Sequence, residues 1–311
     1  MNASREQRPL SISVVIPHMN QPDFLIRSLR ALANQKNTDG LDIEVIVVDN
    51  GSRELPEEIC DLYDNVLLIQ ELEPGPGPAR NKGVSMSSAP ILAFVDADCL
   101  ADENWLSAIW EAFNDRANIK ILGGDVRIAY EDAENLTMLE AYESIYAYRQ
   151  KEYIEKQGFS GTGNLSMRRE IYEEVGPFAG IHVAEDRDWG HRAGEKGHKI
   201  HYLPDMIVRH PARKTLSELQ TKWDRHVSHD FEEQAVGFFG HLKWVAKTVA
   251  VAGSPVFELR RIAKSDRVGG IMERFSAFFV LVHIRLYRGR KMFMMLVKGK
   301  SSSNSGSWNR D

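Results

Sequence analysis

The chain has 311 residues, of which 43% are hydrophobic and 27% are charged, a balance typical of a globular protein that buries a sizeable core. The formal net charge is −5, from 39 basic and 44 acidic residues, so there is no general basic field and we expect no nucleic-acid partner. Cys60 and Cys99 are too few for a disulfide framework or a cysteine-rich zinc site, and no secretory signal is visible over 1–9, so we expect a cytoplasmic protein.

The first hundred residues alternate between apolar strands and amphipathic helices. We expect strands over 12–17, 43–48, 66–69 and 91–95, with helices over 24–32 and 79–87. This pattern is typical of a parallel α/β sheet covered on both faces by helices. Ligands of such sheets bind beyond the carboxyl ends of the strands, and three of these strands end in polar groups, at 17–20, 49–52 and 96–98.

The second half is less regular. We expect a strand over 121–128 that is interrupted by Gly123 and Gly124, a helix over 136–153, a glycine-bearing loop over 158–163 and a strand-like segment before His210. Beyond Pro211 the chain is predicted to be helical, with a C-terminal helical extension over 231–300. Residues 1–10 are expected to be flexible and 301–311 disordered.

The basic, apolar segment over 275–298 has two interpretations. It is compatible with a peripheral contact at the inner face of the membrane. Helices that cover the sheet explain its apolar residues as well, and we favour this core role. The most apolar part, 275–286, contains His283 and Arg285 and is too short to span a bilayer.

Asp96 and Asp98 are candidate ligands for a divalent cation. They follow the apolar run over 91–95, where a buried strand meets solvent, and both carboxylates can point at one ion. Mg²⁺ or Mn²⁺ bound together with a diphosphate is the usual occupant of such a pair. An ordinary polar turn after a strand is an equally good explanation of this motif taken alone.

Three further groups have both a functional and a structural interpretation. Repulsion between Glu185, Asp186 and the nearby Asp188 raises a carboxylate pKa toward values useful for a general base, whereas an acidic helix start is the structural alternative. Arg80 at a helix start suits a diphosphate, although solvated surface bases are the more frequent outcome. His210 suits a metal or phosphate, but a lone histidine more often makes structural hydrogen bonds.

The order of these motifs along the chain resembles that of the family 2 glycosyltransferases of the GT-A fold, over about residues 11 to 230. This resemblance implies an α/β, Rossmann-like, mostly parallel sheet flanked by helices, with a nucleotide-binding half over 11–100 and an acceptor half over 101–230. It also implies a nucleotide-sugar donor and a Mn²⁺ or Mg²⁺ cofactor.

The resemblance also implies a role for each matching residue. The metal ligands would be Asp98, Asp96 and His210. Asp49 would contact the nucleotide base and Arg80 the diphosphate, with Asp96 near the ribose; the remaining donor contacts would be Pro17, Asn20, Gly163 and Asn164. Asp186 would be the general base, with Glu185 shaping its environment. The acceptor contacts would be Trp189, Trp223 and Arg225.

The implied reaction is direct displacement with inversion, from a nucleoside-diphosphate sugar, with a UDP-sugar expected, to a hydroxyl of a saccharide or lipid-linked acceptor. The Gln-x-x-Arg-Trp motif of processive synthases is not matched near Gln220 and Trp223, so we expect transfer of one sugar. One alternative is a sugar-nucleotide pyrophosphorylase, but this chain lacks the glycine-rich phosphate loop that such an enzyme carries after its first strand. A second is an Asp-x-Asp phosphatase, but its aspartates would end the first strand. A third is an inactive nucleotide-sugar-binding scaffold.

Overall fold

The structure is a computed structural model that describes residues 11–234 and 237–298, so the predicted flexible start and disordered tail lie outside the described residues. The described residues form two compact units. The sheet unit contains residues 11–127 and 149–210, and the helical unit contains residues 128–148 and 211–298. Residues 128–148 and 211–230 therefore belong with the C-terminal helices, whereas the sequence predicts a boundary at residue 230.

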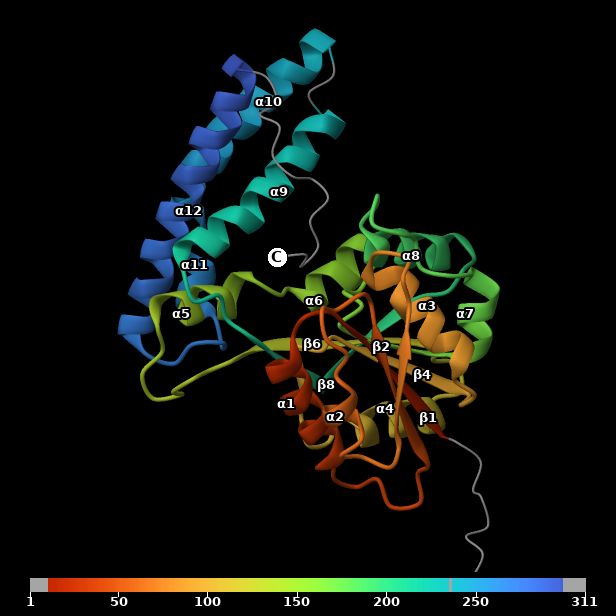
Figure 1. Ribbon diagram of the computed structural model, residues 1–311. Helices are drawn as coiled ribbons and strands as arrows, with labels where there is room; N and C mark the ends of the chain where they lie inside the picture. The colour runs from red at the N-terminus through yellow and green to blue at the C-terminus, as the bar shows by residue number, and fades with distance from the viewer. Residues whose placement is uncertain (1–10, 235–236, 299–311) are drawn as a thin grey trace, which may run out of the picture. The chain divides into compact units, whose positions relative to one another are not determined.

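The sheet unit is built on a mixed sheet of eight strands within the described residues, in the order β3-β2-β1-β4-β7-β6-β8-β5. Figure 1 labels β1, β2, β4, β6 and β8 of this sheet. The strands are Ile12–His18 (β1), Ile43–Asp49 (β2), Val66–Gln70 (β3), Ile91–Val95 (β4), Leu100–Ala101 (β5), Ile121–Ala129 (β6), Asn164–Arg168 (β7) and Ile200–Pro211 (β8). β3, β2, β1 and β4 are parallel, whereas β7 runs antiparallel to β4 and to β6, and β5 runs antiparallel to β8. The predicted α/β sheet is confirmed.

The chain steps from β1 to β2 to β3 in one direction along the sheet, and then returns past β1 to form β4 on its other side. The helices of the sheet unit are α1 (Pro22–Ala33), α2 (Glu57–Cys60), α3 (Pro76–Met86), α4 (Trp105–Asp115), α6 (Gln150–Glu152), the π-helix η1 (Tyr153–Gln157), α7 (Arg169–Val175) and α8 (Glu185–Glu195). Because α1 and α2 step one way along the sheet and α3 steps back, right-handed crossovers place α3 on the opposite face. The gap between β1 and β4 at their carboxyl ends is where ligands bind in such sheets.

Three predicted elements differ from the structure, and glycine or proline explains two of the differences. α3 begins at Pro76, inside the Pro/Gly run, since proline needs no hydrogen-bond donor in a first helical turn. β6 continues through Gly123 and Gly124 without interruption. A Cβ on Gly123 would collide with Ile154 and Ser160, and a Cβ on Gly124 would collide with Asn164 and Met206. The predicted helix over 136–153 is instead divided between α5 (Met138–Tyr146), α6 and η1.

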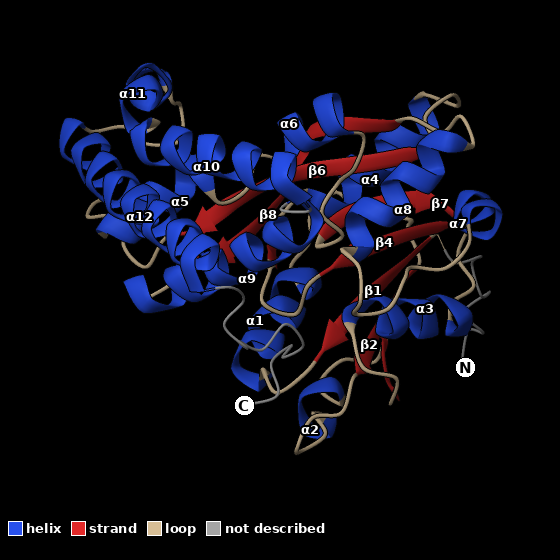
Figure 2. Ribbon diagram, turned by 90° about the horizontal axis from the view of Figure 1, so that it is seen from above, coloured by secondary structure: helices blue, strands red, loops and turns tan. Residues whose placement is uncertain are grey.

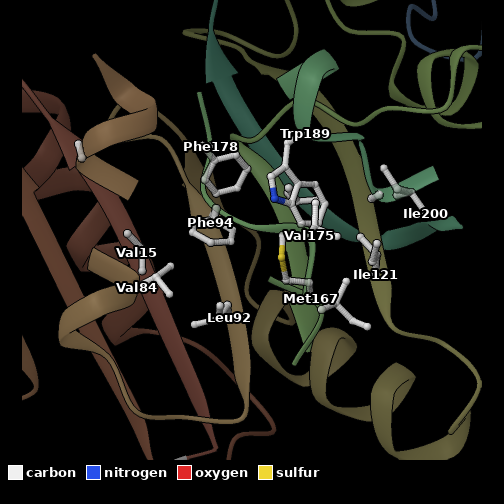
Figure 3. Packing of buried hydrophobic residues seen from close by; sticks show 14 of the residues in the cluster. Val15, Val84, Leu92, Phe94, Ile121, Met167, Val175, Phe178, Trp189 and Ile200 are labelled. Atoms are coloured by element: carbon white, nitrogen blue, oxygen red, sulfur yellow. The ribbon is translucent and has the colours of Figure 1, made fainter. Parts of the chain in front are cut away.

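An aromatic cluster fixes α8 against the sheet. Phe178 lies edge-on to Phe94 of β4, with ring centroids 5.2 Å apart, and 5.5 Å from the ring of Trp189 of α8 (Figure 3). Trp189 is 1% exposed and donates a hydrogen bond to the carbonyl of Gly176. Burial of these rings holds the acidic first turn of α8 in place beside the sheet.

The helical unit contains α5 with α9 (Leu216–Gln234), α10 (Gly237–Gly253), α11 (Pro255–Lys264) and α12 (Ile271–Lys298). α12 packs on the other four helices, and all five are labelled in Figure 2. The segment over 275–298 therefore packs on helices of its own unit. No helix among the described residues is long and apolar enough to cross a bilayer.

Candidate active site

The strand pairing brings the end of β4 beside two segments that are distant in sequence. Asn164, at the start of β7, lies opposite Val95, so the loop before β7 adjoins Asp96. A Cβ on Gly163 in this loop would collide with the Asp96 carboxylate. On the other side, β5 pairs with β8, and this places Nε2 of His210 3.2 Å from Oδ2 of Asp98.

The acidic turn after β4 fits a divalent cation. Ligand atoms of Asp96, Asp98 and Cys99 lie within 4.8 Å of one another. Carboxylate oxygens are the ligands that Mg²⁺ and Mn²⁺ prefer. Burial and the adjacent carboxylates raise the pKa of the Cys99 thiol well above its usual value. A thiol is also a soft ligand, whereas Mg²⁺ and Mn²⁺ prefer oxygen. The two carboxylates are therefore the ligand candidates among these three groups.

Asp98 is the more readily ionised of the two carboxyls. Desolvation raises its pKa, but the charge and hydrogen bond of His210 outweigh this effect and leave the pKa below the ordinary value. The pKa of Asp96 is raised by desolvation and by the charge of Asp98, although Arg80 opposes both effects. A bound cation would offset the repulsion between these two side chains.

Arg80 links the end of β4 to the start of α8. Its side chain is almost wholly buried, its Nη2 lies 2.6 Å from Oδ1 of Asp96, and its Nη1 lies 3.1 Å from Oε1 of Glu185. Its Nε is buried without a hydrogen-bond partner among the described residues. The structure thus places one fixed positive charge between the two predicted acidic groups.

Asp186 has the properties expected of a general base. It lies in the first turn of α8, and its pKa is raised to about 6, mainly by burial and then by the charge of Glu185. The backbone N–H of Arg187 donates to its Oδ1 over 2.7 Å. A carboxyl with this pKa is largely ionised at neutral pH but remains basic enough to accept a proton.

The ends of β1 and β2 form a buried, hydrogen-bonded pair. Asp49 is fully buried; its Oδ2 lies 3.1 Å from Nδ1 of His18, and its Oδ1 accepts from the backbone N–H groups of Gly51 and Ser52. The backbone N–H of Gln21 donates to Nε2 of His18, which places the histidine proton on Nδ1. These hydrogen bonds lower the pKa of Asp49 against the effect of burial.

His18 was missed as a site residue, although the parallel register pairs it directly with Asp49. The sequence did contain a signal for this pair, because His18 and Asp49 are polar residues at the ends of two consecutive predicted strands. Asn20 adopts a positive φ of 52° and accepts from the backbone N–H of Arg53, so it ties the two loops together. Pro17 lies within the buried strand β1. The predicted donor contacts of these loops stay predictions.

Asn164 uses its side chain within the protein. It is fully buried, its Nδ2 donates to the carbonyls of Asp125 and Met206, each over 2.8 Å, and its Oδ1 accepts from Nε1 of Trp105 over 2.9 Å. Both N–H donors of the amide and one of the two lone pairs of its oxygen are therefore used within the protein. Its side chain is placed to hold the strands around the site, and the predicted donor contact of Asn164 stays a prediction.

The three predicted acceptor residues do not gather in the sheet unit. Trp189 is buried in the core, so its side chain is not available to an acceptor in this structure. Trp223 belongs to the helical unit, where the guanidinium of Arg288 lies 3.7 Å from its ring centroid. The side chain of Arg225 lies outside the described residues. Acceptor roles for Trp223 and Arg225 stay predictions.

The sheet, with the paired carboxylates after β4 and the acidic start of α8, agrees with the GT-A fold that the sequence predicts. The model of the family described as Glycosyl transferase family 2 matches residues 13–176, and the chain belongs to this family. It is therefore an enzyme that transfers a sugar from a nucleotide sugar.

Relatives and solved structures agree with this membership. Glycosyltransferase AglE of Haloferax volcanii is 34% identical over 208 residues, which cover 65% of this chain and 67% of AglE. The minor teichoic acid biosynthesis protein GgaA of Bacillus subtilis is 32% identical over 35% of this chain, and the match covers only 26% of GgaA. The mannosyltransferase PcManGT of Pyrobaculum calidifontis, solved with GDP-Man and Mn²⁺, superposes with a TM-score of 0.57 over 95% of this chain and 89% of that one. Its 16% identity shows a shared fold alone.

Proposed function

We propose that this chain is a metal-dependent, inverting and non-processive glycosyltransferase that moves one sugar from a nucleoside-diphosphate sugar to a hydroxyl of a saccharide or lipid-linked acceptor. The observation that carries this proposal is the arrangement around Arg80. One side of the guanidinium contacts Asp96 of the carboxylate pair, and the other contacts Glu185, the neighbour of Asp186. A site for the leaving diphosphate and a candidate base are thus joined by one buried cation.

Asp98 and Asp96, with His210 as a further ligand, are the residues that would hold Mn²⁺ or Mg²⁺. A bound divalent cation supplies positive charge that stabilises the departing diphosphate. Arg80 adds a permanent positive charge at the same end of β4. Because Arg80 is already fixed by two carboxylates, little reorganisation is needed as charge grows on the leaving oxygen.

Asp186 would accept the proton of the acceptor hydroxyl as its oxygen attacks the anomeric carbon. The bond from that carbon to the diphosphate oxygen breaks in the same displacement, so the product has the opposite anomeric configuration. Burial, and then the charge of Glu185, raise the pKa of Asp186 to about 6, while the carboxylate of Glu185 is held by Arg80. Measuring the anomeric configuration of the first-formed product by proton NMR tests this step, and a retained configuration would contradict it.

The donor is best identified by binding. We propose a UDP-sugar first, because the family most often uses one, and GDP-mannose second, because PcManGT was solved with GDP-Man and Mn²⁺. UDP-, GDP- and dTDP-sugars should be screened for thermal stabilisation with and without MnCl₂, since a ligand that binds only the native state raises the melting temperature. One nucleotide class should stabilise the protein in a metal-dependent way. If none does with Mn²⁺ or Mg²⁺, the proposed donor site is wrong.

The pyrophosphorylase alternative makes a different demand. Such an enzyme would release pyrophosphate from a nucleoside triphosphate and a sugar 1-phosphate, whereas the proposed transferase releases a nucleoside diphosphate. Incubating the donor with an acceptor, and separately the matching nucleoside triphosphate with a sugar 1-phosphate, separates the two reactions, because a transferase releases nucleoside diphosphate in the first mixture and a pyrophosphorylase releases pyrophosphate in the second. We expect nucleoside diphosphate only.

A further inference from the structure

α12 has two apolar faces, and only one of them is buried. Its inner face packs into the helical unit through Ala277, Val280, Leu281, Ile284 and Met292. Its other face carries large apolar side chains that are 55–73% exposed, and we call these the outer stripe. The outer stripe consists of Met272, Phe275, Phe279, Leu286, Phe293 and Val297. Their spacing of three, four or seven residues places them on one side of the helix.

Exposed apolar side chains continue on the two preceding helices. Phe239 and Val249 of α10 are 76% and 69% exposed, and Phe257 of α11 is 86% exposed. Single exposed hydrophobic residues are normal on a globular protein. A stripe with three phenylalanines that runs the length of a 28-residue helix is not explained by folding, since these side chains bury little surface within the unit.

The same segment carries a strong positive charge. Residues 237–298 contain 12 Lys and Arg residues but only 3 Asp and Glu residues, a net charge of +9, whereas the whole chain is −5. Three of these cations, Arg260 and Lys264 of α11 and Arg290 of α12, are exposed and make no ion pair with any described residue. Positive charge and exposed aromatic side chains therefore occur on the same helices.

We propose that the outer stripe of α12, together with the cations of α11 and α12, docks on the surface of a bilayer that contains anionic lipids. Phenylalanine and leucine side chains partition into the boundary between headgroups and acyl chains, while lysine and arginine attract anionic headgroups. Because the inner face of α12 is buried in the helical unit, the helix lies along the surface. A second copy of this chain is a poorer occupant, since two segments of net charge +9 repel each other.

Vesicle sedimentation tests this inference with the full chain and without donor or acceptor, so its outcome is independent of the proposed transferase function. Vesicles of phosphatidylcholine alone are compared with vesicles that contain equal parts of phosphatidylcholine and phosphatidylglycerol. We expect stronger binding to the anionic vesicles, weakened by added salt because exposed charges are screened. Absence of binding to both kinds of vesicle would overturn the inference.

Two sets of substitutions separate the apolar and charged contributions. Changing Phe275, Phe279 and Phe293 to Ser should reduce binding about tenfold or more, given the apolar area removed. Changing Arg260, Lys264 and Arg290 to Gln should reduce binding to anionic vesicles on the order of a hundredfold, since each cation near such a surface contributes about fivefold. All six side chains are exposed, so neither set should change the melting temperature by more than a few degrees.

A matched control removes equally exposed apolar side chains from the sheet unit. The control variant carries Leu62→Ser, Leu72→Ser and Met86→Ser, at residues that are 65%, 77% and 48% exposed. It should bind anionic vesicles as the unchanged chain does, and an equal loss in control and stripe variants would contradict a specific role of α12. Light scattering without vesicles gives a further check. A dimer that becomes a monomer in the phenylalanine variant would show that the stripe joins two copies instead.

Discussion

Asp186 is the residue whose surroundings most directly fit a chemical task. Burial and the charge of Glu185 raise its pKa to about 6, while Arg80, paired with Glu185, limits the rise. An unperturbed aspartate is a weaker base, and a more basic one would be protonated at neutral pH. With a pKa of about 6, most of the Asp186 carboxyl groups are ionised at pH 7, which is the form that the proposed base requires.

This pKa predicts the pH dependence of transfer. The rate of the chemical step should rise with pH through about pH 6 and level above it, because the ionised carboxylate is the base. Glu185→Gln removes the negative neighbour, so the rising limb should move to lower pH. A pH–rate profile of kcat for both proteins measures this. An unchanged limb in the Glu185→Gln variant would contradict the proposed coupling.

The same carboxylate should lower the stability of the folded protein when it is ionised. The folded pKa is raised from 3.8 to about 6, so folding favours the protonated form. Asp186→Asn should therefore stabilise the protein by up to about 3 kcal/mol well above pH 6, and this gain should fall away toward pH 3, where Asp186 is largely protonated in both states. Urea unfolding at pH 3 and pH 8 tests the sign, and equal effects at both values would refute the burial argument.

Gly163 matters for its missing side chain. A Cβ there would collide with the Asp96 carboxylate, so Gly163→Ala should displace this carboxylate. Overpacking of this kind typically costs about 1–3 kcal/mol. We therefore expect metal-dependent donor binding to weaken about tenfold or more. Gly194→Ala in α8 is the matched control, because nothing lies within 4 Å of its added Cβ. Calorimetric titration with the donor should show a loss for Gly163→Ala alone.

At the scale of elements, the side-chain amide of Asn164 joins the strands that surround the site. Asn164 of β7 connects β6 through the carbonyl of Asp125, β8 through that of Met206, and α4 through Trp105. These contacts keep the loop at Gly163 next to the end of β4. The antiparallel strands thus support the carboxylate pair that follows a parallel strand.

Asn164→Ala should cost about 3–6 kcal/mol in the free energy of unfolding, because three buried polar groups lose their partner. Asn135→Ala is a suitable control, since the Asn135 side chain is exposed and, within the described part of the chain, bonds only to Asp132. It should change stability by about 0.5 kcal/mol or less. Denaturant unfolding of both variants decides the matter, and similar small losses would show that the amide is dispensable.

At the scale of the whole molecule, the local parts of the fold were predictable and the pairings were not. Continuous apolar runs identify β1, β2, β3 and β4, and their polar ends locate Asp96 and Asp98. The contact of Arg80 with Glu185, 105 residues away, depends on tertiary packing that no local pattern encodes. The membership of residues 128–148 in the helical unit is equally non-local.

Trp189 shows why an aromatic residue near a predicted site is easily misplaced. Its neighbours in sequence are acidic and basic, so nothing in the local pattern distinguishes an exposed ring from a buried one. Packing against Phe178 places it in the core. Burial is the larger cause of the raised pKa of Asp186 and was not predictable from sequence, whereas the smaller effect of the adjacent Glu185 was.

The central claim is that Asp98 serves donor binding and Asp186 serves the chemical step. Calorimetric titration of the donor in the presence of Mn²⁺, together with transfer rates, should be measured for the unchanged chain, Asp98→Ala and Asp186→Asn. Asp98→Ala should abolish metal-dependent donor binding, whereas Asp186→Asn should keep the Kd within about twofold and lower kcat about 10²- to 10⁴-fold. Equal loss of donor binding in both variants would contradict this division of roles.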